Sequence, residues 1–313
     1  MARNVGIVGA GLVGSGWAIV FARASLNVKV YDESPKTRDT VMSVVRANLA
    51  ELEKFGLVKG ADEIAARITV CDEMSRAVDD VEYVQESVFE TVEAKRSVYE
   101  KLSELVGSNT IIGSSSSGIP ASAFTAHLPI KERCLIAHPV NPPYLVPVVE
   151  IVPAPWTHQS AINYTVALMS EVGQSPVVVR REVEGFILNR LQGALLNEAW
   201  KLFEEGYASI EDIDKTVREG LGLRWAFMGP FETIDLNAPG GVKDYAYRLR
   251  SLYYHIAQSR RDPSLWSNEL IERVETERAK LLPRNQLEAR RRWRDRRLMA
   301  LVAYLREQRH KDP

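Results

Sequence analysis

Asn4-Val-Gly-Ile-Val-Gly-Ala-Gly-Leu-Val-Gly14 is the stretch that decides the fold. It is a short apolar run followed by glycines spaced as GxGxxG, and a helix-like run continues from residue 15 to residue 24. In a strand–turn–helix unit the first glycine permits the tight turn, the second lets a pyrophosphate approach the backbone, and the third lets the helix pack on the strand. Free N–H groups at the start of the helix then bind the phosphates.

A second apolar run, residues 27–31, ends at Asp32, about 20 residues after the glycines, where a dinucleotide-binding unit needs an acid. A carboxylate there accepts hydrogen bonds from a ribose 2′-hydroxyl and repels a 2′-phosphate, so we predict NAD as the cofactor. The alternative, a glycine turn with an unrelated aspartate, is less favoured because strand, helix and acid occur in the required order. The predicted cofactor contacts are Gly9, Gly11, Leu12, Val13, Gly14 and Asp32.

Strand-like and helix-like runs alternate as far as residue 184. Further strand-like runs occupy residues 67–71, 81–88, 110–112, 134–137, 146–152 and 176–179, and helix-like runs occupy residues 35–54, 91–106 and 157–172. This alternation predicts an α/β fold with a doubly wound, mostly parallel sheet of the Rossmann type. Ligands bind outside the carboxyl ends of such strands, so the serines at 114–117 and His138 should open towards the nicotinamide.

From residue 185 onward the pattern is helical, and Ser209-Ile-Glu-Asp212 is a capping box that starts a helix. We therefore predict an NAD-binding domain at residues 1–184 and an all-α domain for substrate binding and dimerisation at residues 185–313. Long amphipathic helices in such a domain often pack against a second copy, so we expect a homodimer. The arginine-rich run at 290–297 is interpreted as a solvated or subunit-facing helix rather than a nucleic-acid arm, because apolar residues follow it at helical spacing.

The composition excludes several classes of protein. With 313 residues, 45 % hydrophobic and 26 % charged, the chain is an ordinary globular protein of two-domain size. A net charge of -1 offers no attraction to nucleic acid or anionic lipid. Cys71 and Cys134 form neither a CxxC nor a metal-ligand pattern, so we expect no metal site and a reduced setting. The first strand begins without a charged leader, and no apolar run approaches the roughly 20 residues that span a bilayer, so we expect a cytoplasmic protein that does not bind membranes.

His138-Pro-Val-Asn-Pro-Pro-Tyr-Leu-Val-Pro-Val-Val-Glu150 places a histidine at the end of one apolar run and a carboxylate inside the next. If the glutamate holds one ring nitrogen, the other is left as a base for proton transfer near neutral pH. The alternative is a core histidine and a solvated glutamate, and the spacing alone does not separate the two.

Several long motifs in order resemble the L-3-hydroxyacyl-CoA dehydrogenase superfamily, and more closely its lambda-crystallin / L-gulonate 3-dehydrogenase branch. Besides the glycine motif with its aspartate and the histidine segment, they are Ser114-Ser-Ser-Ser-Gly-Ile-Pro120, Gly185-Phe-Ile-Leu-Asn-Arg-Leu191 and Glu219-Gly-Leu-Gly-Leu-Arg-Trp-Ala-Phe-Met-Gly-Pro-Phe-Glu-Thr233. The resemblance covers nearly the whole chain and implies an NAD-dependent oxidoreductase that acts on a secondary alcohol.

The resemblance also implies roles for particular residues. His138 corresponds to the catalytic histidine, and Glu150 to the glutamate that pairs with it. Ser116 and Asn189 would bind the reacting oxygen of the substrate and hold it near the base.

Because four serines run together, a shift from Ser116 to Ser115 or Ser117 stays open. The further family-like positions around the ribose and nicotinamide are Glu90, Lys95 and Asn141.

The substrate depends on the second half of the chain. Arg224 is our candidate for binding the carboxylate of a small hydroxy acid, because a guanidinium binds carboxylates through two hydrogen bonds; the alternative is a surface ion pair. Trp225 and Phe227 suit either a cage for a quaternary ammonium or the protein core. We rank L-gulonate, oxidised to 3-dehydro-L-gulonate, first, carnitine or another small 3-hydroxy acid second, and 3-hydroxyacyl-CoA third. A hypothesis of another class is an NAD-binding, crystallin-like structural protein without turnover.

Overall fold

The computed structural model describes residues 3–260, 264–309 and 311. The chain divides into two compact units. One contains the residues up to Gly193 together with those from Arg294 onward, and the other contains Ala194–Trp293.

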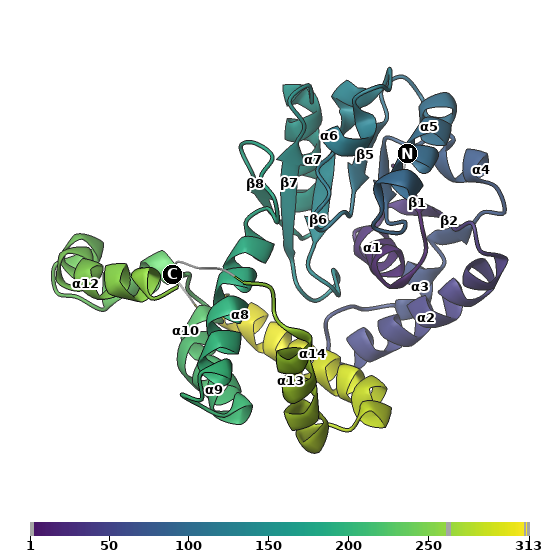
Figure 1. Ribbon diagram of the computed structural model, residues 1–313. Coiled ribbons are helices and arrows are strands. Elements are labelled where there is room, and N and C mark those ends of the chain that lie inside the picture. Colours follow the sequence, from purple (N-terminus) through teal and green to yellow (C-terminus); the bar gives the residue numbers. More distant parts are fainter. Residues whose placement is uncertain (1–2, 261–263, 310, 312–313) are drawn as a thin grey trace. The chain divides into compact units, whose positions relative to one another are not determined.

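A single sheet forms the centre of the first unit, with the strand order β3-β2-β1-β4-β5-β6-β7-β8 across it (Figure 1). Its strands are β1 (Asn4–Val8), β2 (Asn27–Tyr31), β3 (Ile68–Val70), β4 (Tyr83–Glu86), β5 (Ile111–Ser114), β6 (Cys134–Pro139), β7 (Val148–Pro153) and β8 (Ser175–Val178). Neighbouring strands are parallel except β6 and β7, which are antiparallel. The predicted doubly wound, mostly parallel α/β sheet is confirmed.

Helices cover both faces of this sheet (Figure 1). They are α1 (Leu12–Arg23), α2 (Pro35–Lys54), α3 (Ala61–Ala65), α4 (Met74–Val78), α5 (Val92–Leu105), α6 (Ser122–Thr125) and α7 (Gln159–Glu171). Ile7 and Val8 are adjacent in β1 but belong to two different clusters of buried apolar side chains. Adjacent side chains of a strand point to opposite faces, so the strand is buried on both sides, which explains its continuous apolar sequence.

The described residues of the second unit contain helices and no strand. The helices within it are α9 (Ile210–Lys215), α10 (Gly222–Trp225), α11 (Pro230–Leu236), α12 (Gly241–Gln258) and α13 (Asn268–Leu281), with a π-helical segment at Thr216–Leu221. The predicted capping box is present, since Ser209 Oγ accepts a hydrogen bond from the Asp212 N–H at 3.1 Å and caps α9. In the described part of the chain, no helix combines the length and apolarity needed to cross a membrane.

Two long helices, α8 (Leu188–Glu204) and α14 (Leu287–Arg309), each contribute to both units. The compact units are bounded after Gly193 and after Trp293, and the division into an NAD-binding and an all-α domain after residue 184 stays a prediction. The last part of α14 belongs to the first unit, where Met299 is only 2 % exposed within that unit's apolar core. Arg296 Nε also pairs with Glu51 at 2.8 Å, and Arg306 donates to the Leu57 carbonyl at 3.1 Å. This half of the arginine-rich helix is thus a packing element of the first unit.

Candidate active site

The antiparallel pairing of β6 and β7 places His138 directly opposite Glu150. His138 Nδ1 and Glu150 Oε2 are 2.8 Å apart, and the two side chains are 7 % and 2 % exposed. An ionised carboxylate can only accept, so Nδ1 carries the hydrogen of the neutral imidazole and Nε2 is left with its lone pair. Nε2 has no partner in the described part of the chain. The pair therefore forms an oriented base.

The other oxygen of Glu150 caps the start of helix α8. Oε1 accepts hydrogen bonds from the N–H groups of Ile187 at 2.7 Å and Leu188 at 3.0 Å. Burial by itself raises the pKa of Glu150, but the hydrogen bonds from His138, Leu188 and Ile187 together outweigh it, and the pKa lies below its ordinary value. The carboxylate is therefore ionised wherever the histidine works as a base.

A left-handed backbone segment brings those two N–H groups to Glu150. Gly185 has φ +73° and Phe186 has φ +50°, and a side chain in this region is uncommon because it is strained. Phe186 is fully buried, and its ring lies 5.8 Å from the His138 ring, centre to centre. The Phe186 ring thus packs beside the imidazole, a role that the sequence pattern did not indicate.

The glycine turn after β1 has the shape that a dinucleotide requires. Gly9 has φ +95°, and a Cβ on it would lie 2.5 Å from the Ser87 carbonyl oxygen. A Cβ on Gly14 would fall on the Gly9 carbonyl oxygen, so the third glycine is needed for close packing. A Cβ on Gly11 would meet no atom within 4 Å. The open space at Gly11 adjoins the first residues of α1, Leu12 and Val13, where the helix N–H groups lack a side-chain cap and can bind a pyrophosphate.

Asp32 follows β2 and is half-buried. Its carboxylate accepts hydrogen bonds from the Ala10 N–H at 2.7 Å and the Ser34 N–H at 2.9 Å. The first of these bonds ties the acid to the glycine turn, so the carboxylate predicted to bind the ribose and the turn predicted to bind the phosphates are held together. These residues fit NAD.

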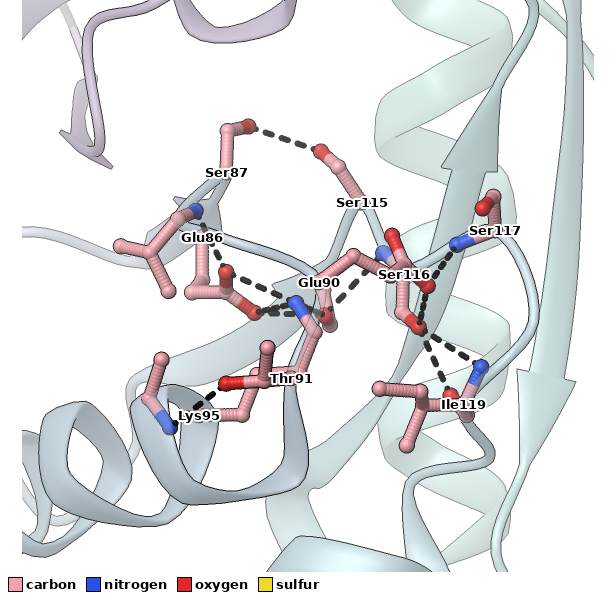
Figure 2. A network of polar contacts seen from close by, with 12 residues as sticks. Glu86, Ser87, Glu90, Thr91, Lys95, Ser115, Ser116, Ser117 and Ile119 are labelled. Atoms are coloured by element: carbon pink, nitrogen blue, oxygen red, sulfur yellow. Dashed lines mark hydrogen bonds and ion pairs between the residues drawn. The ribbon is translucent and has the colours of Figure 1, made fainter.

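Glu90, which lies just before α5, accepts hydrogen bonds from the serine loop that follows β5 (Figure 2). Glu90 Oε1 accepts from Ser116 Oγ at 2.6 Å, from the Ser117 N–H at 2.7 Å and from the Gly118 N–H at 3.0 Å. Burial raises the pKa of Glu90, but these bonds and the charge of Lys95 together hold it below its ordinary value. Glu90 thus fixes the serine loop.

The three candidate serines occupy different environments. Ser116 is fully buried, and its Oγ also accepts a hydrogen bond from the Ile119 N–H at 3.0 Å, so its hydroxyl is enclosed in the loop. Ser117 is exposed, and its carbonyl accepts a hydrogen bond from Asn189 Nδ2 at 2.6 Å. Ser115 is half-buried, and its Oγ accepts a hydrogen bond from Gln85 Nε2 of β4 at 2.8 Å. The structure therefore brings Ser117, not Ser116, to the exposed position beside Asn189.

Lys95 is a predicted cofactor contact, but its side chain is buried in an ion pair. Its Nζ is 3.0 Å from both oxygens of Glu86 and 3.2 Å from Ser114 Oγ, and the side chains of the ion pair are 1 % and 0 % exposed (Figure 2). The ammonium has no surface left for a ribose. Lys95 instead neutralises the buried carboxylate at the end of β4, which in turn accepts from the Val88 N–H at 2.7 Å and holds the loop before Glu90.

Two further predicted residues lie in different parts of the chain. Asn141 is exposed in the loop between β6 and β7, in the same unit as His138. Arg224 lies in α10 of the second unit with an exposed side chain, and its carboxylate-binding role stays a prediction.

Comparison with known proteins agrees with this geometry. Residues 4–183 match the family model of the 3-hydroxyacyl-CoA dehydrogenase NAD binding domain, and residues 185–281 match that of the 3-hydroxyacyl-CoA dehydrogenase C-terminal domain. The chain belongs to the 3-hydroxyacyl-CoA dehydrogenase family. The predicted resemblance is confirmed, and with it the NAD cofactor and the assignment to the oxidoreductases.

Relatives within the 3-hydroxyacyl-CoA dehydrogenase family differ in what their names say of them. Lambda-crystallin of Oryctolagus cuniculus is 39 % identical over 312 residues, which are 98 % of this chain and 97 % of the relative. L-carnitine dehydrogenase of Streptomyces griseus is 37 % identical over 247 residues, 79 % of this chain and 72 % of the relative. Among solved structures, 5-formyl-3-hydroxy-2-methylpyridine 4-carboxylic acid 5-dehydrogenase, an NAD-dependent dismutase, superposes with a TM-score of 0.84 at 29 % identity, covering 98 % of this chain and 99 % of that one.

Proposed function

We propose that the protein oxidises the 3-hydroxyl of a small hydroxy acid, L-gulonate first, in a hydride transfer to NAD. The observation that carries the proposal is the buried pair of His138 and Glu150 at 2.8 Å, at the same edge of the sheet as the glycine turn. NAD, when bound, accepts the hydride from the substrate carbon. The hydroxyl proton must then leave, and the free Nε2 of His138 is the base available for it.

Glu150 makes this proton transfer favourable in two ways. Its hydrogen bond to Nδ1 fixes the ring and the tautomer that exposes a lone pair on Nε2. Once His138 has taken the proton, the ionised carboxylate stabilises the imidazolium at a site where little water screens the charges. Glu150 itself keeps its charge throughout.

Ser117 and Asn189 are our candidates for holding the reacting oxygen, which replaces the expected role of Ser116. The support is the exposure of Ser117 and the 2.6 Å bond from Asn189 to its backbone, which orients the amide. Hydrogen bonds from these groups position the hydroxyl against the base and add no acid or base of their own.

A small acid is favoured as substrate over a CoA thioester by a relative that matches nearly the whole chain. The pyridine carboxylic acid dehydrogenase, whose name gives a small acid, aligns with 98 % of this chain. A small acid needs a cation for its carboxylate, and Arg224 is our candidate. L-carnitine is the second candidate, supported by the L-carnitine dehydrogenase relatives.

The test is NADH formation by the purified protein with L-gulonate, L-carnitine, 3-hydroxybutyrate and 3-hydroxybutyryl-CoA. We expect L-gulonate to give the highest kcat/KM. A higher value with 3-hydroxybutyryl-CoA would contradict the small-acid proposal. NAD binding without turnover of any substrate would favour the crystallin-like structural role instead.

Arg224→Met tests the carboxylate contact. Loss of a bidentate guanidinium should raise the KM for the acid and leave NAD affinity unchanged. Arg248→Met, which removes another exposed arginine of the second unit, is the matched control. An unchanged KM in the Arg224 variant removes this residue from the substrate site.

We also propose that the protein is a homodimer. Helix α12 carries exposed Tyr247, Leu252, Tyr253, Tyr254 and Ile256, each at least 44 % accessible. Monomeric proteins rarely leave large contiguous apolar surface in water, and a second copy of an amphipathic helix is a common partner for it. Light scattering should give twice the mass of the chain, and Tyr254→Glu should lower it to a monomer's.

We also propose that the protein is located in the cytoplasm. Cys71 and Cys134 are both free and buried, as suits a reducing compartment.

A further inference from the structure

Gln85 is a fully buried amide in the parallel sheet, and its hydrogen bonds have a fixed direction. Its Oε1 accepts from the Tyr83 hydroxyl at 2.7 Å, and its Nε2 donates to Ser115 Oγ at 2.8 Å and to the Ala137 carbonyl at 3.2 Å. A carbonyl oxygen can only accept, so Ala137 determines which end of the amide is the nitrogen. Both amide hydrogens are therefore used, and one of them is on Ser115.

Ser115 Oγ is the centre of this network. Besides the Gln85 amide it accepts from Trp17 Nε1 at 3.2 Å, and an indole N–H can only donate. A hydroxyl oxygen has two lone pairs and one hydrogen, so both lone pairs are taken. Ser87 Oγ lies 2.8 Å from Ser115 Oγ (Figure 2), and only the Ser115 hydrogen is left for that bond. Ser115 donates, and Ser87 accepts.

The hydroxyl hydrogen of Ser87 therefore takes no part in this network. It has no acceptor among the residues that the structure describes. Ser87 is half-buried, so part of the residue is open to a ligand. Its backbone lies against the glycine turn, since its carbonyl oxygen is 2.5 Å from where a Cβ on Gly9 would be. Ser87 thus lies between the phosphate-binding turn and the serine loop.

We propose that Ser87 donates this hydrogen to an acceptor oxygen on the nicotinamide half of bound NAD, a ribose hydroxyl or the carboxamide. In a doubly wound sheet the pyrophosphate lies over the turn after β1, and the acid after β2 binds the ribose of the adenosine half. The nicotinamide half of NAD then lies on the other side of β1, towards β4, where Ser87 follows the strand. Trp17, Gln85 and Ser115 set the direction of the Ser87 bond and are positioning residues for the cofactor.

The experiment compares the binding of NAD and ADP by calorimetry, because ADP lacks nicotinamide and its ribose. Ser87→Ala removes the donor, Ser87→Thr keeps it, and Ser108→Ala is a matched control at an exposed serine with no hydrogen bond of its own side chain in the described structure. We expect Ser87→Ala to weaken NAD binding by roughly threefold to tenfold, the size of one neutral hydrogen bond. ADP affinity should stay at the wild-type value, and the threonine and control variants should bind NAD as the wild type does.

Two results would overturn the proposal. Equal losses of NAD and ADP affinity in Ser87→Ala would mean that the acceptor is not on the nicotinamide half. Unchanged NAD affinity would mean that the hydroxyl faces solvent only. The melting temperature of each variant, measured alongside, separates these results from a loss of fold. Because the readout is binding, it does not depend on which hydroxy acid is the substrate, and a wild-type protein that failed to bind ADP would contradict the dinucleotide site itself.

Discussion

Replacing Glu150 by glutamine should abolish most of the activity without removing the cofactor site. Replacing Glu150 by alanine would not test the base alone, because it would also destabilise the fold. It would leave His138 Nδ1–H and the N–H groups of Ile187 and Leu188 without their acceptor, in a pocket where the side chain is only 2 % exposed. A buried donor left without an acceptor costs about 1–3 kcal/mol, and because the Ile187 and Leu188 bonds are only partly buried, the three donors together cost at most roughly 9 kcal/mol. That is comparable with the whole stability of a domain, about 5–15 kcal/mol.

Glutamine keeps the volume and one carbonyl oxygen. If that oxygen stays on the two backbone N–H groups, the amide nitrogen faces His138 Nδ1, and an amide N–H can only donate. Nδ1 must then accept, the imidazole hydrogen moves to Nε2, and the base is lost. General-base catalysis contributes about 10²–10⁴-fold, and at 1.36 kcal/mol per decade this range corresponds to about 2.7–5.4 kcal/mol in the barrier.

The assay is kcat for NADH formation with the preferred acid, together with NAD affinity and melting temperature. Glu104→Gln, at an exposed position of α5, is the matched control. A wild-type kcat in Glu150→Gln, with the fold intact, would refute the role of the pair. There is also a pH signature. The pKa of Glu150 is lowered in the folded state, so its stabilisation is present above the ordinary value of 4.5 and is lost as pH falls through the folded value. The difference in unfolding free energy between wild type and variant should therefore shrink at acid pH.

Three further predictions, with five substitutions in all, follow from contacts at the same edge of the sheet. Gly11→Ala, whose Cβ meets open space, should keep the melting temperature and weaken NAD binding, whereas Gly14→Ala, whose Cβ falls on a backbone oxygen, should destabilise the protein by about 1–3 kcal/mol in urea unfolding. Ser117→Ala should lower kcat by roughly tenfold to hundredfold, while Ser116→Ala should mainly lower stability, by about 1–3 kcal/mol; the reverse pattern would return the substrate contact to Ser116. Lys95→Met leaves a carboxylate uncompensated in the core, so unfolding free energy should fall by about 3–5 kcal/mol. The NAD affinity of the folded Lys95 variant should stay near the wild-type value, and a selective loss of affinity at full stability would restore Lys95 to the cofactor site.

The sheet could be predicted from the sequence because its strands are buried on both faces. Adjacent apolar residues such as Ile7 and Val8 serve two separate cores, and turn glycines and helix caps punctuate the runs between them. The division into units could not be predicted in the same way. Helix α14 has arginines on every side at its start. Its packing on the first unit includes the buried side chain of Met299, an ion pair between Arg296 and Glu51, 245 residues apart, and the hydrogen bond from Arg306 to the Leu57 carbonyl. No local pattern encodes a contact at that separation.

The serine run shows why residue types alone do not define the site. Ser115, Ser116 and Ser117 are chemically identical and consecutive, yet one accepts a hydrogen bond from a side chain of β4, one is enclosed in its own loop and one is exposed beside Asn189. What separates them is Glu90, 26 residues before Ser116, which accepts the hydroxyl of one serine and the backbone N–H of the next. Which serine hydroxyl is exposed therefore depends on the hydrogen bonds of a carboxylate in a different loop. In a chain with all four serines but no hydrogen-bond acceptor at position 90, nothing would hold the loop in the conformation that exposes the Ser117 hydroxyl.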